Sequence, residues 1–182
     1  MNYKFTPENI TSLGRDEVFV FGSNLAGNHA GGAARVARER FGAIMGQGVG
    51  MQGQSYAIPT MQGGVDTIKP YVDDFIKFAQ KHSDMTFYVP RIGCGIAGFK
   101  DEEIAPLFDV AFDLPNVVLP KAFWNIINHA RQLASETSGM VFHSVPIEFF
   151  PEDIEKTQNM NQKEKTDFII SLKQYGRSLM SH

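Results

Sequence analysis

The stretch Phe21–Arg40, FGSNLAGNHAGGAARVARER, decides the architecture that the sequence predicts. It continues the apolar run Glu17–Phe21, EVFVF, which is typical of a buried strand. From Gly31 onward apolar residues recur at helical spacing, so we expect the strand to break into a glycine-rich loop and restart as a helix. The N–H groups of Gly31 and Gly32 then lie at the positive end of a helix dipole, which favours an anionic phosphate.

A second glycine-rich loop, Arg91–Phe99 (RIGCGIAGF), follows the predicted strand Met85–Pro90. Its segment Gly93–Gly98 matches GxGxxG, the dinucleotide fingerprint. The same pattern occurs at Gly48–Gly53 with no preceding strand, so the match has low specificity. The next predicted strand, Asn116–Leu119, is followed by proline and lysine where a Rossmann site needs an acidic residue for the ribose. A Rossmann-type dinucleotide binder is therefore the less favoured alternative.

The rest of the chain alternates strands with helices. We expect a strand at Ser55–Thr60, helices at Asp66–Lys81 and Ala122–Ala134, and a loop at Gly42–Gly53 with room for a short strand near Val49. Three acidic residues at Asp101–Glu103 suit a helix start, and Pro106 keeps that helix short. This order predicts an α/β fold, a three-layer α-β-α sandwich with a mixed, mostly parallel central sheet.

Composition narrows the class of protein. The 182 residues, 43% of them hydrophobic and 20% charged, suit one globular domain with its own core. A net charge of −3 leaves no excess of basic residues to bind a nucleic-acid backbone. We therefore expect nucleic acid as a partner only where it carries the modification that the protein recognises. Cys94 is the single cysteine and the five histidines show no metal-binding spacing. The sequence therefore predicts no intramolecular disulfide, no metal site and no cofactor.

The order of the predicted strands and helices indicates that residues 1–139 form the α/β domain. We expect residues 140–182 to form a mainly helical extension packed on that domain, beginning with an apolar strand or excursion at Met140–Pro151 and ending in two helices. The N-terminus lacks the apolar run of a signal peptide, and no apolar stretch approaches the length of a membrane helix. We therefore expect a cytoplasmic protein without a membrane partner.

Taken together, GSNLAGNHAGGAARVA and IGCGIAGFKDEEIAPLF resemble the two ligand loops of macrodomains, α/β modules that bind ADP-ribose. The upstream stretch ENITSLGRDEVFVFGSN is similar to the opening segment and strand of that family, and the likeness covers about residues 8–119. The resemblance implies binding of ADP-ribose or a related nucleotide diphosphate, possible hydrolysis of ADP-ribosyl groups, and no metal. The alternative is a non-catalytic module that reads a nucleotide or an ADP-ribosylated protein. It also implies an ADP-ribosylated protein as a partner.

The resemblance also assigns site residues. Asn24 matches the strand-end asparagine near the distal ribose, and Gly31 with Gly32 match the glycine pair that receives the diphosphate. Asn9 stands where the family usually has an aspartate that contacts adenine. The full set expected to bind ligand is Asn9, Gly22, Ser23, Asn24, Gly31, Gly32, Gly93, Cys94, Gly95, Ile96, Ala97, Gly98 and Phe99. If hydrolysis occurs, Asn24 and His29 are the residues expected to position water.

Several of these residues have alternative interpretations. His29 could donate to phosphate or act as a general base, or it could be an exposed loop histidine. Asn24 could bind a ribose hydroxyl, or it could stabilise its own turn. Cys94 is interpreted as a small residue that fits between glycines, rather than as a nucleophile. Phe99 is expected to pack in the core rather than stack on adenine, and Arg91 is either a phosphate ligand or a surface charge. No acidic residue lies between Ser23 and Arg38, so binding is better supported than hydrolysis.

Overall fold

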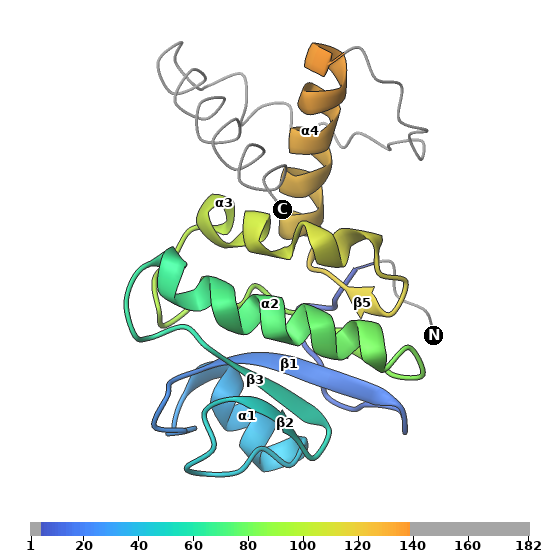
Figure 1. The fold of residues 1–182 in the computed structure, drawn as a ribbon. Coiled ribbons are helices and arrows are strands. Elements are labelled where there is room, and N and C mark those ends of the chain that lie inside the picture. The colour runs from blue at the N-terminus through green and yellow to red at the C-terminus, as the bar shows by residue number, and fades with distance from the viewer. Residues whose placement is uncertain (1–4, 139–182) are drawn as a thin grey trace. The chain divides into compact units, whose positions relative to one another are not determined.

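The structure is a computed structural model that describes residues 5–138. The chain divides into two compact units, Met1–His129 and Ala130–His182. The strands are β1 (Glu17–Ser23), β2 (Gly50–Gln52), β3 (Ser55–Pro59), β4 (Thr86–Tyr88) and β5 (Val117–Val118). The helices are α1 (Gly32–Arg40), α2 (Val65–Lys81), α3 (Asp101–Ile104) and α4 (Lys121–Ser138), with 3-10 turns η1 (Ala105–Phe108) and η2 (Val110–Asp113) (Figure 1).

Most predicted elements of residues 5–138 are confirmed, with shifted ends. The short strand expected near Val49 is β2, and α3 has four residues before the chain passes Pro106 as a 3-10 turn. The strand expected at Met85–Pro90 is wrong in its length, because only Thr86–Tyr88 pairs in the sheet. The strand or excursion expected at Met140–Pro151 and the two final helices lie outside the described residues. No helix among the described residues is long and apolar enough to cross a membrane.

The sheet is mixed and has the order β2-β3-β1-β4-β5. The central strand β1 runs parallel to β3 on one side and to β4 on the other, and β5 runs parallel to β4. Only β2, at one edge, is antiparallel to its neighbour β3. The carboxyl ends of four strands therefore meet at one end of the sheet, where ligands of open α/β sheets bind.

Alternation along β1 builds a core on each face of the sheet. Val18 and Val20 belong to the cluster that includes the apolar stripe of α2, whereas Phe19 and Phe21 belong to a second cluster with the alanines of α1. Figure 1 shows α1 and α2 on opposite sides of the sheet. The protein is therefore an α/β protein with helices on both faces, an arrangement compatible with a three-layer α-β-α sandwich.

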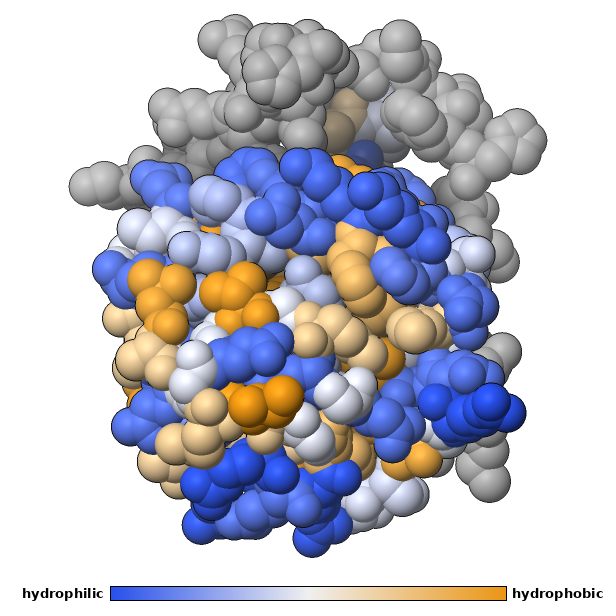
Figure 2. Space-filling model, turned by 60° about the horizontal axis from the view of Figure 1, so that its bottom comes forward, coloured by the Kyte–Doolittle hydropathy of each residue, from blue (hydrophilic) through white to orange (hydrophobic). Residues whose placement is uncertain are grey.

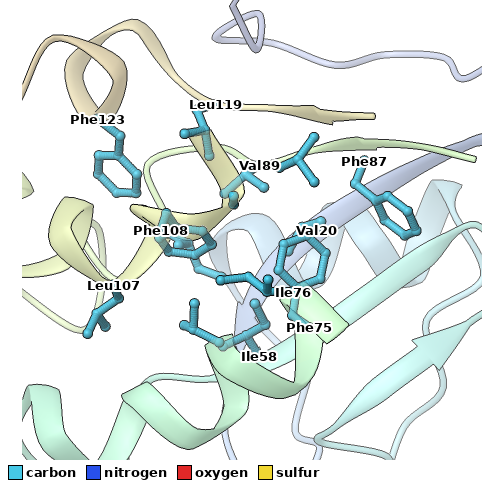
Figure 3. Close-up of a cluster of buried hydrophobic side chains, with 14 of the residues drawn as sticks. Val20, Ile58, Phe75, Ile76, Phe87, Val89, Leu107, Phe108, Leu119 and Phe123 are labelled. Atoms are coloured by element: carbon cyan, nitrogen blue, oxygen red, sulfur yellow. The ribbon is translucent and has the colours of Figure 1, made fainter. Parts of the chain in front are cut away.

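The larger core lies between the sheet, α2 and η1 (Figure 3). Phe75 of α2 is fully buried at its centre, with ring centroids 5.2 Å from Tyr56, 5.6 Å from Phe87 and 6.3 Å from Phe108. Full burial of one such side chain contributes about 1.5–3 kcal/mol relative to exposure. This aromatic packing joins α2 to β3, β4 and η1.

Candidate functional site

The carboxyl ends of β1 and β4 enclose a hollow of about 340 Å³. From β1 the chain passes through α1 towards β3 on one side, whereas from β4 it passes through α3 to β5 on the other. Two connections that leave neighbouring strands in opposite directions make a topological switch point, the usual place for a ligand in an open α/β sheet. The volume lies within the range typical of small-molecule sites.

The structure brings most of the predicted site residues to this hollow. Those that line it are Gly22, Ser23, Asn24, Gly31, Gly32, Gly93, Gly95, Ile96 and Ala97. Cys94, Gly98 and Phe99 belong to the second loop without lining the hollow. Phe99 packs against the larger core, in agreement with the expectation that it packs rather than stacks on adenine.

The start of α1 forms one wall. Gly31 is the N-cap residue, with an extended φ of −140°, and Gly32 follows with a φ of +54°, a conformation that favours glycine. The first N–H groups of a helix have no carbonyl partner within it, and the first turn of α1 carries no acidic side chain. Hydrogen-bond donors without competing negative charge therefore lie at this wall.

The second glycine loop forms the opposite wall. It is closed by a bond from Phe99 N–H to Gly93 O of 3.0 Å, and Gly93 has a φ of +76°. Ile96 at its tip is 73% exposed and reaches across to the glycine pair, since a Cβ atom on Gly31 would lie 3.4 Å from Ile96 Cδ1. The two loops that the sequence places far apart therefore touch each other at the mouth of the hollow.

Arg91 is the only residue with a formal charge among the described residues that line the hollow. Its guanidinium forms a bidentate ion pair with Asp101, with Nε–Oδ1 and Nη2–Oδ2 distances of 2.8 and 2.6 Å. Because Arg91 begins the second loop and Asp101 lies just beyond its last residue, Phe99, this pair ties the two ends of the loop together. Arg91 is thus paired with Asp101 and braces the loop. It also lines the hollow, so the interpretation as a phosphate ligand and the interpretation as a surface charge both stay open.

The side chain of Asn24 is occupied by its own loop. Its Nδ2 donates to Asn28 O at 2.9 Å, and Asn28 N–H donates back to Oδ1 at 3.0 Å. Each atom of the amide retains one further hydrogen-bonding position. The turn-stabilising interpretation of Asn24 accounts for both bonds, and Asn24 still lines the hollow.

His29 is not the exposed loop histidine that one interpretation describes. Its side chain is fully buried rather than exposed, and it does not line the hollow. The ring packs edge-on against Phe21, with centroids 5.1 Å apart, and Nε2 lies 3.0 Å from Gln47 O. The interpretation of His29 as an exposed loop histidine is therefore wrong, whereas its role towards a phosphate or a water molecule stays a prediction.

Asn9 also lies apart from the hollow. It lines a separate, smaller pocket of about 110 Å³ with Pro7, Glu17 and Tyr88 among its neighbours. The contact of Asn9 with adenine that the resemblance implies stays a prediction, since Asn9 does not line the larger hollow. Motifs read along the chain do not determine where the segment before β1 packs.

Sequence reasoning missed several residues that line the hollow: Asn28, Ala30, Ala33, Ala34, Thr60, Met61, Pro90 and Ile92. Thr60 and Met61 follow β3 directly, and Thr60 N–H donates to Ser23 O at 2.9 Å, so the end of β3 continues alongside β1. The rule that parallel strands deliver their carboxyl ends to one place could have identified these two residues. Figure 2 shows hydrophobic side chains in several patches among polar ones on the face that it draws.

Cys94 has the character of an inert thiol. Burial, with the nearby Asp101 carboxylate adding to it, raises the pKa of Cys94 to about 12. A thiol with this pKa is protonated near neutral pH and is a poor nucleophile. Within residues 5–138 no group of three His, Cys, Asp or Glu side chains comes together to hold a metal ion.

No protein-family model matches this chain, and neither a curated protein nor a solved structure was found to match it.

Proposed function

We propose that this chain binds ADP-ribose or a related nucleotide diphosphate in the hollow between the ends of β1 and β4. The observation that carries the proposal is the meeting of two glycine loops there: the start of α1 at Gly31 and Gly32, and the loop Gly93–Ala97. Both loops present backbone without bulky side chains, apart from Ile96 at the mouth. A diphosphate fits such a place because N–H donors at a helix start stabilise a negative charge by about 0.3–1 kcal/mol, and up to about 2 kcal/mol when partly buried.

Binding is better supported than hydrolysis. Among the described residues that line the hollow there is no Asp, Glu, His, Lys, Cys or Tyr, so no side chain of the usual general acid or base type faces the ligand space. Asn24 remains as a residue that could orient a water molecule, with its amide braced by Asn28. We therefore favour a reader of ADP-ribose, free or attached to a protein, over an ADP-ribosyl hydrolase.

A Rossmann-type dinucleotide site receives less support. The GxGxxG segment at Gly93–Gly98 is followed by α3, which has only four residues and carries Asp101, Glu102 and Glu103 in its first turn. Three carboxylates at a helix start repel a diphosphate. The helix start that is free of acid is that of α1, in the other loop.

The proposal is tested by thermal-shift titration of the full chain with ADP-ribose, AMP and NAD. A ligand at 100 times its dissociation constant adds about 2.7 kcal/mol to the free energy of unfolding. Stabilisation by ADP-ribose is expected, and the absence of a shift with all three compounds would reject the proposal. Incubation with a mono-ADP-ribosylated protein separates reader from hydrolase: a reader binds the modified protein and leaves the label in place.

Substitution of Gly31 locates the site. Gly31→Glu places a carboxylate at the N-cap of α1, in an ordinary φ region and with only the flexible Ile96 side chain nearby, so the fold should tolerate it. We expect the variant to retain its melting temperature and lose ADP-ribose binding. Gly64→Glu is the matched control, because Gly64 is the N-cap of α2, has open space around it and does not line the hollow.

A further inference from the structure

Two loops pack against each other beside the hollow, and His29 is the single titratable residue in either of them. The first loop is residues 24–31, between β1 and α1. The cover loop is residues 42–53, which includes the short strand β2 and contains no charged residue. The His29 side chain is fully buried between them, with its ring against Phe21. A fully buried imidazole is unusual because its polar nitrogens need partners.

The partners of the ring determine its tautomer. Nε2 lies 3.0 Å from Gln47 O. A carbonyl oxygen can only accept, so Nε2 carries the hydrogen, and in a neutral ring Nδ1 is then the bare acceptor nitrogen. Within residues 5–138 this buried Nδ1 finds no hydrogen-bond partner. A proton added to Nδ1 would find no acceptor among the described residues and would place a charge on a fully buried ring.

The bond from His29 belongs to a seam of hydrogen bonds between the two loops. Gln47 O also accepts from Gln52 Nε2 at 3.1 Å, and Gly46 N–H donates to Gly27 O at 3.0 Å. The backbones touch, because a Cβ atom on Gly27 would lie 2.3 Å from Gln47 N. The cover loop therefore holds the first loop in place.

Within β1, α1 and the two loops, the acidic residues are Glu17 and Glu39. The charged residues on β1 and α1 are Glu17, Arg35, Arg38, Glu39 and Arg40. Both oxygens of the Glu17 carboxylate are bonded elsewhere, to Tyr88 Oη at 3.0 Å and to Gly14 N–H at 2.6 Å. The Glu39 carboxylate lies 4.0 Å from Arg35 and 3.6 Å from Arg38, with its side chain half exposed.

We infer that His29 is a positioning residue for the proposed ligand site: as a neutral ring with hydrogen on Nε2 it closes the seam, and its protonation opens the seam. Residues of the first loop that line the hollow, Asn28 and Gly31 among them, then lose their position relative to β1. The inference about the seam stands on the contacts of His29 alone. Its consequence for ligand affinity rests on the proposed function.

Nuclear magnetic resonance of the full chain labelled with ¹⁵N-histidine tests the seam without any ligand. At about pH 7.5 we expect His29 to show a protonated Nε2 and an unprotonated Nδ1. Lowering the pH to about 5.5 should shift the amide signals of residues 24–31 and 42–53 together with the imidazole signals. A neutral ring with hydrogen on Nδ1, a ring charged at the higher pH, or loop amides indifferent to its titration would overturn the inference.

Two variants distinguish the effect of the hydrogen bond to Gln47 O from the effect of protonating residue 29. His29→Gln keeps an N–H donor for Gln47 O and cannot take up a proton in this range, whereas His29→Leu keeps apolar packing on Phe21 and loses the donor. We expect His29→Gln to retain the melting temperature and to show a smaller fall in melting temperature between about pH 7.5 and pH 5.5 than the unmodified chain. His29→Leu should melt lower at both values. Equal acid sensitivity of the unmodified chain and His29→Gln contradicts a role for the proton.

The effect of pH on ligand affinity is measured with ADP-ribose. AMP is unsuitable because its phosphate monoester itself titrates near pH 6. Affinity of the unmodified chain should fall about tenfold or more over the same pH range, and that of His29→Gln should fall less. Failure of ADP-ribose to bind at either pH would remove the proposed function, while the resonance and melting experiments would still decide the inference about His29. Binding that weakens with acid equally in both proteins would overturn the link between His29 and the ligand site.

Discussion

The side chain of Ile96 lies against Gly32: a Cβ atom on Gly32 would stand 3.1 Å from Ile96 Cδ1. This contact joins the second glycine loop to the start of α1 across the mouth of the hollow. Ile96 is also among the most exposed large hydrophobic side chains of the described residues, at 73%. Because this side chain is so exposed, it contributes little to stability, and in the proposed function it would cover the bound ligand.

Ile96→Ala should therefore change ligand exchange more than it changes folding. We expect the melting temperature to be retained and the dissociation rate of ADP-ribose to rise by about 3- to 10-fold, because the side chain covers the ligand rather than the core. Stopped-flow displacement measures the rate. Val110→Ala is the control, since Val110 is 44% exposed and does not line the hollow. Equal rates in the two variants would contradict a covering role for Ile96.

Gly48→Ala should destabilise the fold by separating the two loops. A Cβ atom on Gly48 would lie 2.2 Å from Asn24 O, and a backbone atom cannot move aside as a flexible side chain can. We expect a loss of about 2–3 kcal/mol in the free energy of unfolding, measured with urea. Gly46→Ala has open space and only a positive φ of +88° to strain it, so its loss should be about 1–2 kcal/mol. A Gly48→Ala variant no less stable than Gly46→Ala would show that the loops are not held as described.

Cys94 should be slow to react with iodoacetamide in the native protein. Burial raises its pKa to about 12, compared with about 8.5 for an exposed thiol, so the thiolate fraction stays small until the pH approaches 12. The native alkylation rate should be far below that of the urea-unfolded chain at pH about 8.5. Because the folded pKa is the higher one, the stability associated with the neutral thiol is present below about pH 8.5 and is lost as the pH rises towards 12. Equal native and unfolded rates would contradict this.

Asp101→Asn should loosen the second loop modestly. The variant removes the charge that binds Arg91 and keeps the side-chain shape. Because the Arg91 side chain is 60% exposed, we expect a loss of only about 0.5–1 kcal/mol in the free energy of unfolding, smaller still in high salt. Asp74→Asn is the control: its pair with Lys77 is exposed on both sides, at 3.5 Å, and should contribute nothing measurable. A salt-independent loss, or none, would contradict bracing by the ion pair.

Sequence patterns predicted those helices and strands that are determined by residues adjacent in the chain. The apolar run of β1, the apolar stripe of α2 and the proline that shortens α3 each follow from the chemistry of adjacent residues. The pairing of β4 was overestimated because apolar residues beyond Tyr88 are buried without belonging to the strand: Val89 is fully buried yet lies outside it. A run of hydrophobic residues predicts that the segment is buried. Burial alone does not show where a strand ends and the following segment begins.

The sequence by itself determined where the two glycine loops stand along the chain and that each follows a strand, because glycine content and strand periodicity are written in neighbouring residues. Only the tertiary structure decided that the loops meet, since this depends on β1 and β4 lying side by side in the order β2-β3-β1-β4-β5. The same holds for His29, whose burial comes from a loop 18 residues away at Gln47, and for Asn9, whose pocket is formed with Glu17 and Tyr88. Contacts between distant segments arise from strand order and packing, which no local pattern encodes.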